Sequence, residues 1–282
     1  MQRIRNSAFL GSVHSRFDRT VNVQCTENGE LYTIAACTID NGPNTIVIRA
    51  GRLSGLGIAT GDRVYADRAM LYVERKLAVS IADAAAWKSA LPNYPLDDRR
   101  LRRNLIAAKA FVELEGKNGG MKRAAARDNL FDAEVSKRLE ERSSSLLFAL
   151  SKGDTAGARD HALTLIGLGP GLTPSGDDYL LGLFTIVNLP NSPLRRYRPL
   201  CADIANEAAG LTNPISHMGL IKAAAGQVRE SVVELLRSLT DGDPEQAIRC
   251  LKAVLNIGSS SGTDIAMGLI HGLELIAQHR WR

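Results

Sequence analysis

The sequence predicts an α+β protein, with a small antiparallel β-rich domain, a sheet or a barrel, at residues 1–92 and a larger all-helical domain at residues 97–282. Three observations support this division. Up to about residue 90, short β-rich runs alternate with turn signals. Pro92 and Pro95 then exclude a helix and break strand pairing. From residue 97 onwards, apolar residues recur near the 3.6-residue period of a helix.

Turn residues and period-two alternation place the strands of the N-terminal domain. Turns are predicted at residues 27–29 and 61–62, and the runs after them are rich in β-branched and aromatic residues. Strands are predicted over residues 21–25, 31–34, 45–48, 63–66, 71–73 and 77–79. A short helix over residues 82–88 is expected to close this domain, and residues 91–95 are expected to form a linker.

Helical periodicity continues through most of the second domain. Helices are predicted over residues 98–116, 132–151, 155–166, 176–188, 196–210, 215–239, 244–256 and 262–279. A good helix start is found at residues 243–246, where Asp243 can cap the helix, Pro244 fits its first turn and Gln246 occupies the capping-box position.

The composition excludes several classes of protein. Of 282 residues, 45% are hydrophobic and 23% are charged, and 35 Lys and Arg against 30 Asp and Glu give a net charge of +5. This balance is typical of a globular chain and excludes wholesale disorder. The basic runs at residues 99–103 and 195–198 lack interleaved aromatic residues, so no nucleic-acid partner is predicted. The longest apolar segment, residues 179–187, is too short to cross a membrane.

The cysteines indicate a reducing compartment. Cys25, Cys37, Cys201 and Cys250 form no C-x-x-C pair, and no histidine lies at zinc-finger spacing from them. They are interpreted as reduced, mostly buried thiols. The apolar stretch at residues 8–10 is far too short for a signal peptide, so we expect a cytoplasmic protein.

A Gly- and Pro-rich stretch at residues 167–178 is the most unusual part of the chain. It holds four glycines and two prolines in twelve residues, and it leads into a predicted helix. Glycine lets a ligand approach the backbone amides, and the free N–H groups at a helix start bind phosphate or carboxylate. The alternative is a tight connection between two helices, with caps at Ser175 and Asp177. The candidate substrate-binding residues are Gly169, Gly171, Thr173, Ser175, Gly176 and Asp177.

A second loop repeats part of this pattern. Residues 175–183 align without gaps with residues 261–269, because both read Ser-Gly-x-Asp, three residues, then Gly-Leu. The two loop-to-helix units could face each other around one site, although small residues also recur by coincidence. The alignment pairs Asp178 with Asp264, and carboxylates beside an anion site suit an amide N–H, a proton or Mg²⁺. Further candidates are Ser259, Ser260, Ser261, Gly262 and Thr263, with a serine-rich helix cap as the alternative.

A third segment contributes Asn213, Ser216 and His217 as candidates. Asn213-Pro214 favours a turn before the predicted helix over residues 215–239. His217 falls in the first turn, where a neutral imidazole could donate to a carbonyl or act as a base. A single histidine can equally make a structural contact.

Together, these motifs resemble a known family. The Gly-Leu-Gly-Pro-Gly-Leu-Thr-Pro-Ser-Gly-Asp-Asp stretch, the Asn-Pro-Ile-Ser turn and the Ser-Ser-Gly-Thr-Asp loop are similar to a bacterial domain family that includes the AllH-like subunit of oxamate carbamoyltransferase, from anaerobic allantoin degradation. The resemblance covers most of the chain. It implies reversible conversion of oxalurate and phosphate to oxamate and carbamoyl phosphate, with other subunits as partners. The chain lacks the Ser-x-Arg-Thr phosphate motif of the common carbamoyltransferase fold, so a different scaffold is implied.

Three hypotheses follow for function. In the first, the loops at residues 167–178 and 258–264 bind small anions such as carbamoyl phosphate and oxamate, while Asp178, Asp264 and His217 are catalytic, orienting an amide or moving a proton. In the second, Asp177, Asp178 and Asp264 hold Mg²⁺ or Mn²⁺ in a hydrolase. In the third, the chain is a non-catalytic scaffold subunit. No cofactor is predicted, although Mg²⁺ would suit the carboxylates.

Overall fold

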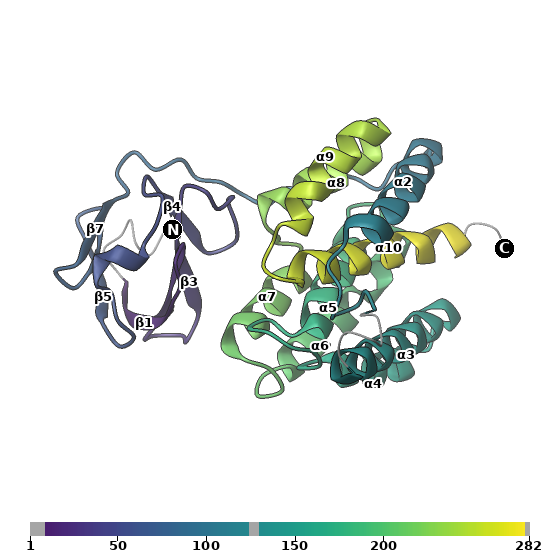
Figure 1. The fold of residues 1–282 in the computed structure, drawn as a ribbon, viewed down its shortest axis with the longest axis horizontal. Helices are drawn as coiled ribbons and strands as arrows, with labels where there is room; N and C mark the ends of the chain where they lie inside the picture. Colours follow the sequence, from purple (N-terminus) through teal and green to yellow (C-terminus); the bar gives the residue numbers. More distant parts are fainter. Residues whose placement is uncertain (1–8, 124–129, 280–282) are drawn as a thin grey trace. The chain divides into compact units, whose positions relative to one another are not determined.

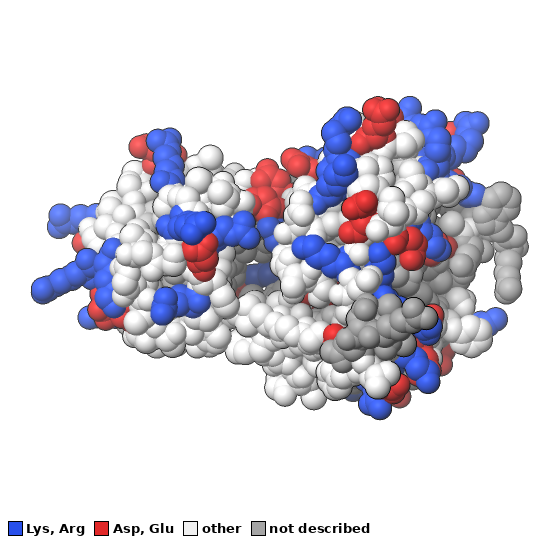
Figure 2. Space-filling view, viewed as in Figure 1, with Lys and Arg blue, Asp and Glu red and all other residues white. Residues whose placement is uncertain are grey.

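The computed structural model describes residues 9–123 and 130–279 and divides the chain into two compact units, Met1–Ser89 and Ala90–Arg282. Within the described residues, the first unit contains seven strands and the second contains nine α-helices (Figure 1). The order of a β-rich part followed by a larger helical part is therefore confirmed. On the face drawn in Figure 2, Lys and Arg are interspersed with Asp and Glu.

The first unit is one seven-stranded sheet that curls towards a barrel. Its strands are β1 (Leu10–Arg16), β2 (Thr20–Cys25), β3 (Leu31–Ala36), β4 (Thr45–Ile48), β5 (Arg63–Asp67), β6 (Met70–Val73) and β7 (Leu77–Ser80). The spatial order is β4-β3-β2-β1-β5-β6-β7. All pairs are antiparallel, as predicted for this domain, except β3 and β4 at one edge, which run parallel.

Two features of this unit differ from the sequence prediction. The strand β1 was missed because its sequence, LGSVHSR, is poor in β-forming residues. Gly11 is nevertheless required there, since a Cβ would overlap the carbonyl oxygen of Gln24 on β2. The predicted helix over residues 82–88 is absent. Most of those seven residues are exposed, and so short a segment does not hold a helix without a buried face.

The second unit is helical throughout its described length. Its helices are α2 (Arg99–Glu115), α3 (Leu130–Lys152), α4 (Thr155–Leu165), α5 (Ser175–Asn188), the 3₁₀ helix η2 (Pro193–Tyr197), α6 (Arg198–Glu207), α7 (Pro214–Ala224), α8 (Glu230–Asp241), α9 (Pro244–Leu255) and α10 (Ser261–His279). The predicted start of α9 is confirmed, because Asp243 accepts a hydrogen bond from the Gln246 amide at 2.8 Å. Among the described helices, none combines the length and apolarity needed to cross a membrane.

The helix predicted over residues 215–239 is in fact two helices. A left-handed residue, Gly226 with φ of +73°, ends α7. Its amide donates to Ala223 and the next amide, of Gln227, donates to Lys222, which is the hydrogen-bond pattern of a Schellman cap. The predicted helix over residues 196–210 likewise begins as a separate 3₁₀ turn, because Pro193 starts η2.

The segment expected to be a linker is packed onto the helical unit. Tyr94 is buried, and its amide donates to the carbonyl of Pro190 at 2.8 Å. Its hydroxyl lies 3.4 Å from Asp98, just before α2. The two prolines therefore shape an extended strap on this unit rather than a free connection. The four cysteines are free, and Cys25 and Cys201 are buried, whereas Cys37 is exposed and Cys250 partly exposed, so the expectation of mostly buried thiols holds for two of them.

Helices α5 and α10 form the centre of the second unit. A Cβ at Gly182 would overlap the carbonyl oxygen of Ile265, and a Cβ at Gly268 would overlap that of Tyr179. These are reciprocal contacts between positions that the internal alignment pairs, since Gly182 matches Gly268 and Tyr179 matches Ile265. Farther along, Gly272 lies against Ile186, its aligned partner. The two repeats therefore pack side by side in the same direction, with their N-terminal loops at one end.

Candidate functional site

The Gly- and Pro-rich loop connects α4 to α5 and folds back onto the first turn of α5. Gly167, Gly169 and Gly171 have φ values of +73°, +118° and +100°, a region that favours glycine. A Cβ at Gly169 would lie 2.7 Å from the amide nitrogen of Ser175, so this glycine also allows a close backbone approach. The conformation of the loop therefore depends on its glycines, whether or not a ligand binds.

Asp177 holds this loop from the inside. One of its oxygens accepts a hydrogen bond from the Gly167 amide at 2.9 Å, and the other accepts from the Thr212 hydroxyl. Burial raises the pKa of the Asp177 carboxyl, while these donors and the hydroxyl of Ser216 act in the opposite direction. Because both oxygens are engaged with the protein, these contacts give Asp177 a positioning role. They also tie the first loop to the third segment.

Asn213 makes the second tie between the loop and the third segment. Its side-chain oxygen caps α7 by accepting from the amides of Ile215 and Ser216, at 3.0 and 3.1 Å. Its side-chain nitrogen donates to the carbonyl of Leu172 at the loop tip, at 2.7 Å. The turn predicted from Asn213-Pro214 is confirmed, and the side chain has a structural function there.

Replacing Asn213 by alanine should lower the free energy of unfolding by about 2 kcal/mol, because both the helix cap and the bond to Leu172 are lost. Replacing it by aspartate should lower it by only about 1 kcal/mol, since aspartate keeps the cap but cannot donate to Leu172. Urea denaturation measures both values. Equal losses in the two variants would show that the bond to the loop contributes nothing.

The second loop precedes α10 and is covered by a segment that the sequence analysis did not select, residues 116–123. The Lys117 amide donates to the Thr263 hydroxyl at 2.9 Å, and the Met121 amide donates to Asp264 at 2.7 Å. Gly120 packs so closely that a Cβ would overlap Asp264 and crowd Ser175. Of the predicted residues, Ser259 is exposed while Thr263 and Asp264 are fully buried. The residues Asn118-Gly119-Gly120 are a turn signal in this segment. A turn signal does not predict which other part of the chain the turn will contact, so the contact with the second loop could not be predicted from it.

The two loops meet. The Thr173 hydroxyl of the first loop lies 2.8 Å from the Ser261 hydroxyl of the second and donates to Asp178 at 2.8 Å. Burial raises the pKa of Asp178 well above its usual value, and the nearby Asp264 and Asp177 raise it further. Burial also raises the pKa of Asp264, to about 6. The structure thus brings together the two carboxyls that the repeat pairs, in surroundings that favour their protonated forms.

Six amides at the two helix starts are already bonded within the protein. Each of them donates to a carbonyl oxygen within its own loop or turn. They belong to Gly176, Asp177, Asp178, Gly262, Thr263 and Asp264. A Cβ at Gly176 would overlap the carbonyl oxygen of Leu165, and one at Gly262 would overlap that of Val254. These two glycines therefore serve packing against the preceding helix, and a ligand would meet side chains and loop tips instead.

Two buried oxygens at this junction lack a hydrogen-bond partner. They are Oγ of Ser175 and Oδ2 of Asp264, on residues with no exposed surface. The Ser175 hydroxyl lies near enough to lower the pKa of Asp264, although the two side chains do not meet the geometry of a hydrogen bond. Buried polar atoms are normally paired, and the described residues hold further exceptions, among them the hydroxyls of Ser136 and Ser216.

His217 is placed on α7, where its ring contacts another helix. Nε2 lies 3.1 Å from the carbonyl oxygen of Ala205 on α6 and donates to it. This bond fits the structural alternative, and no described contact brings the ring to Asp178 or Asp264. A catalytic role for His217 stays a prediction.

The carboxylates do not assemble as a metal site. Over residues 9–123 and 130–279, no group of three or more His, Cys, Asp and Glu side chains is arranged to hold a metal ion. Asp177 turns its oxygens to Gly167 and Thr212, away from a shared centre with the other two. Among these residues, the structure therefore shows no set of metal ligands of the kind that the metal-hydrolase hypothesis needs.

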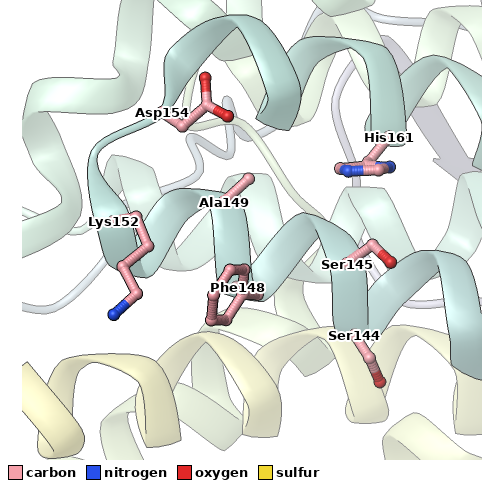
Figure 3. Close-up of a pocket in the computed structure, with 7 residues that line it drawn as sticks. All are labelled: Ser144, Ser145, Phe148, Ala149, Lys152, Asp154 and His161. Atoms are coloured by element: carbon pink, nitrogen blue, oxygen red, sulfur yellow. The ribbon is translucent and has the colours of Figure 1, made fainter.

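A cavity of about 610 Å³ lies between α3 and α4, apart from the predicted residues. Figure 3 shows its lining side chains. They are Ser144, Ser145, Phe148, Ala149, Lys152, Asp154 and His161. None of them belongs to the three predicted segments.

Comparison with family models identifies the relatives of the chain. Residues 165–273 match the model described as oxamate carbamoyltransferase subunit AllH, and residues 1–86 match the AllH family N-terminal domain. The chain belongs to the AllH family. No solved structure matches it. The first AllH match spans both repeats and the third segment, and the N-terminal match spans every strand of the sheet. Residues 116–123, which cover the second loop, lie outside both matches.

Proposed function

We propose that the chain is a subunit of oxamate carbamoyltransferase that exchanges a carbamoyl group between phosphate and oxamate. The main support is that the part matching the AllH model is also the part in which Thr173, Asp178, Ser261 and Asp264 come together. The described carboxyls have surroundings suited to proton transfer, which an acyl transfer to nitrogen requires.

The proposed chemistry follows from the bonds that change. The amide nitrogen of oxamate attacks the carbonyl carbon of carbamoyl phosphate, the bond from that carbon to the phosphate oxygen breaks, and the nitrogen loses a proton. Asp264, with a pKa of about 6, takes this proton and passes it to the departing phosphate, and the transfer runs backwards in the reverse direction. Asp178, kept neutral by burial, donates a hydrogen bond to the developing oxyanion. The hydroxyls of Thr173 and Ser261 hold Asp178 in place.

The proposal includes the partners and the setting. The substrates are small anions, namely carbamoyl phosphate with oxamate, or oxalurate with phosphate. Other subunits of the enzyme bind this chain. The enzyme acts in the cytoplasm, in the degradation of allantoin.

The test uses the assembled enzyme. The complex of this chain with its partner subunits should form oxamate and carbamoyl phosphate from oxalurate and phosphate. Asp178→Asn should lower kcat about tenfold or more, because an amide N–H is a weaker hydrogen-bond donor to the developing oxyanion than the O–H of a neutral carboxyl. Asp154→Asn is the control, because either residue can cap α4. A wild-type complex without turnover would refute the function. Full activity in Asp178→Asn would refute the role of Asp178 and favour the scaffold hypothesis.

A further inference from the structure

The predicted site is acidic, although its proposed substrates are anions. Asp177, Asp178 and Asp264 lie at the junction of the two loops. The predicted residues include no lysine or arginine. Bringing a phosphate or carboxylate beside these carboxyls requires a compensating cation, because a buried charge without a partner is strongly unfavourable.

The segment over residues 116–123 brings a cation to this junction. Two of its backbone amides, those of Lys117 and Met121, are bonded to Thr263 and Asp264. These bonds fix the backbone of Lys117 at the first turn of α10. The Lys117 ammonium then lies 3.1 Å from the carbonyl oxygen of Gly258, where the second loop begins. The side chain is exposed, and a carbonyl occupies only one of its three N–H donors.

A second observation points to a ligand beside the same segment. The partnerless oxygens of Ser175 and Asp264 lie directly against Gly120, three residues after Lys117. The segment therefore borders both a cation with spare donors and buried polar atoms that lack a partner.

We propose that Lys117 binds the anionic group, phosphate or carboxylate, of the substrate at the second loop, and this rests on the proposed function. Lys117 is thereby a specificity residue for anions. The exposed hydroxyl of Ser259 in the same loop is a further donor for the anion. Lys122 has a different role, because its ammonium donates to the carbonyl of Gly116 at 2.8 Å and so closes the end of α2.

The experiment compares three variants in the full complex. Lys117→Met removes the charge and keeps the apolar stem, Lys117→Arg keeps the charge, and Lys109→Met removes an equal charge elsewhere. Lys109 pairs with Glu274 of α10 at 2.6 Å. Glu274 lies ten residues beyond Asp264 and hence about 15 Å farther along the helix. Steady-state kinetics give KM for phosphate and for oxamate, and titration with inorganic phosphate at low and high salt gives Kd.

We expect Lys117→Met to raise KM and Kd for one of the two anions about tenfold or more with little change in kcat, and to flatten the salt dependence of binding. Lys117→Arg should recover most of the affinity, and Lys109→Met should behave as the wild type. Unchanged affinities in Lys117→Met, with a wild-type complex that turns over, would overturn the role of Lys117 and leave the function intact. Equal losses in Lys109→Met would overturn it as well, by showing a general charge effect. A wild-type complex that neither binds nor reacts would refute both.

Discussion

Replacing Gly268 by valine should lower the free energy of unfolding by about 3 kcal/mol or more. The first side-chain atom would fall on the carbonyl oxygen of Tyr179, which belongs to the backbone of α5 and cannot rotate away. Relief requires α5 and α10 to separate, and both helices are buried along most of their length. Gly182→Val should have a similar effect, because its contact with Ile265 is the reciprocal one.

The control for this prediction is Gly219→Ala on α7. A Cβ at Gly219 would meet only the Leu181 side chain, at 3.4 Å, which is ordinary contact. Alanine inside a helix should therefore stabilise the protein by about 0.5–1 kcal/mol. Thermal or urea unfolding measures all three variants. If Gly268→Val unfolds at the wild-type midpoint, then α5 and α10 do not pack as closely as the structure shows.

Replacing Asp264 by asparagine should lower kcat about 100-fold or more in the assembled enzyme, because the proposed proton acceptor is lost. Asparagine is nearly the same size, and its carbonyl oxygen can still accept from the Met121 amide. The covering segment should therefore stay in place. A kcat within a factor of three of the wild type would remove Asp264 from the proposed mechanism.

The same variant should change how stability depends on pH. Burial raises the pKa of Asp264 from 3.8 to about 6, so the folded state binds this proton more tightly than the unfolded state. Its contribution is fully present below pH 3.8 and is lost as the pH rises to about 6. The difference in unfolding free energy between wild type and Asp264→Asn should shift by about 2 kcal/mol between pH 4 and pH 7, in favour of the variant at the higher pH.

The control for the pH prediction is Gly219→Ala, because this substitution removes no ionisable group. Its difference from wild type should stay constant over the same pH range. Urea denaturation at several pH values provides the data. A constant difference for Asp264→Asn would mean that this carboxyl titrates in the folded protein as it does in the unfolded chain.

The candidate site could be predicted in part because its motifs are local. The Ser-Gly-x-Asp repeat placed Ser175 and Ser261 at the starts of two helices, and the structure brings those helices together. The glycines of the repeat suggested ligand approach, but they serve packing instead. Gly176 and Gly262 make room for a carbonyl oxygen of the preceding helix, and no sequence pattern separates these two uses of glycine.

From the residues alone we could predict the order of a β-rich part and a helical part, most helix positions and the two matched helix starts. These features follow from turn chemistry and apolar periodicity, which act over a few residues. Three features come instead from the folded chain: six first-turn amides of α5 and α10 are occupied, β4 runs parallel to β3, and Lys117 lies against the second loop. Each of these features depends on contacts with other parts of the folded chain, such as the hydrogen bond from the Lys117 amide to the Thr263 hydroxyl. The periodicity of apolar residues does not encode such contacts.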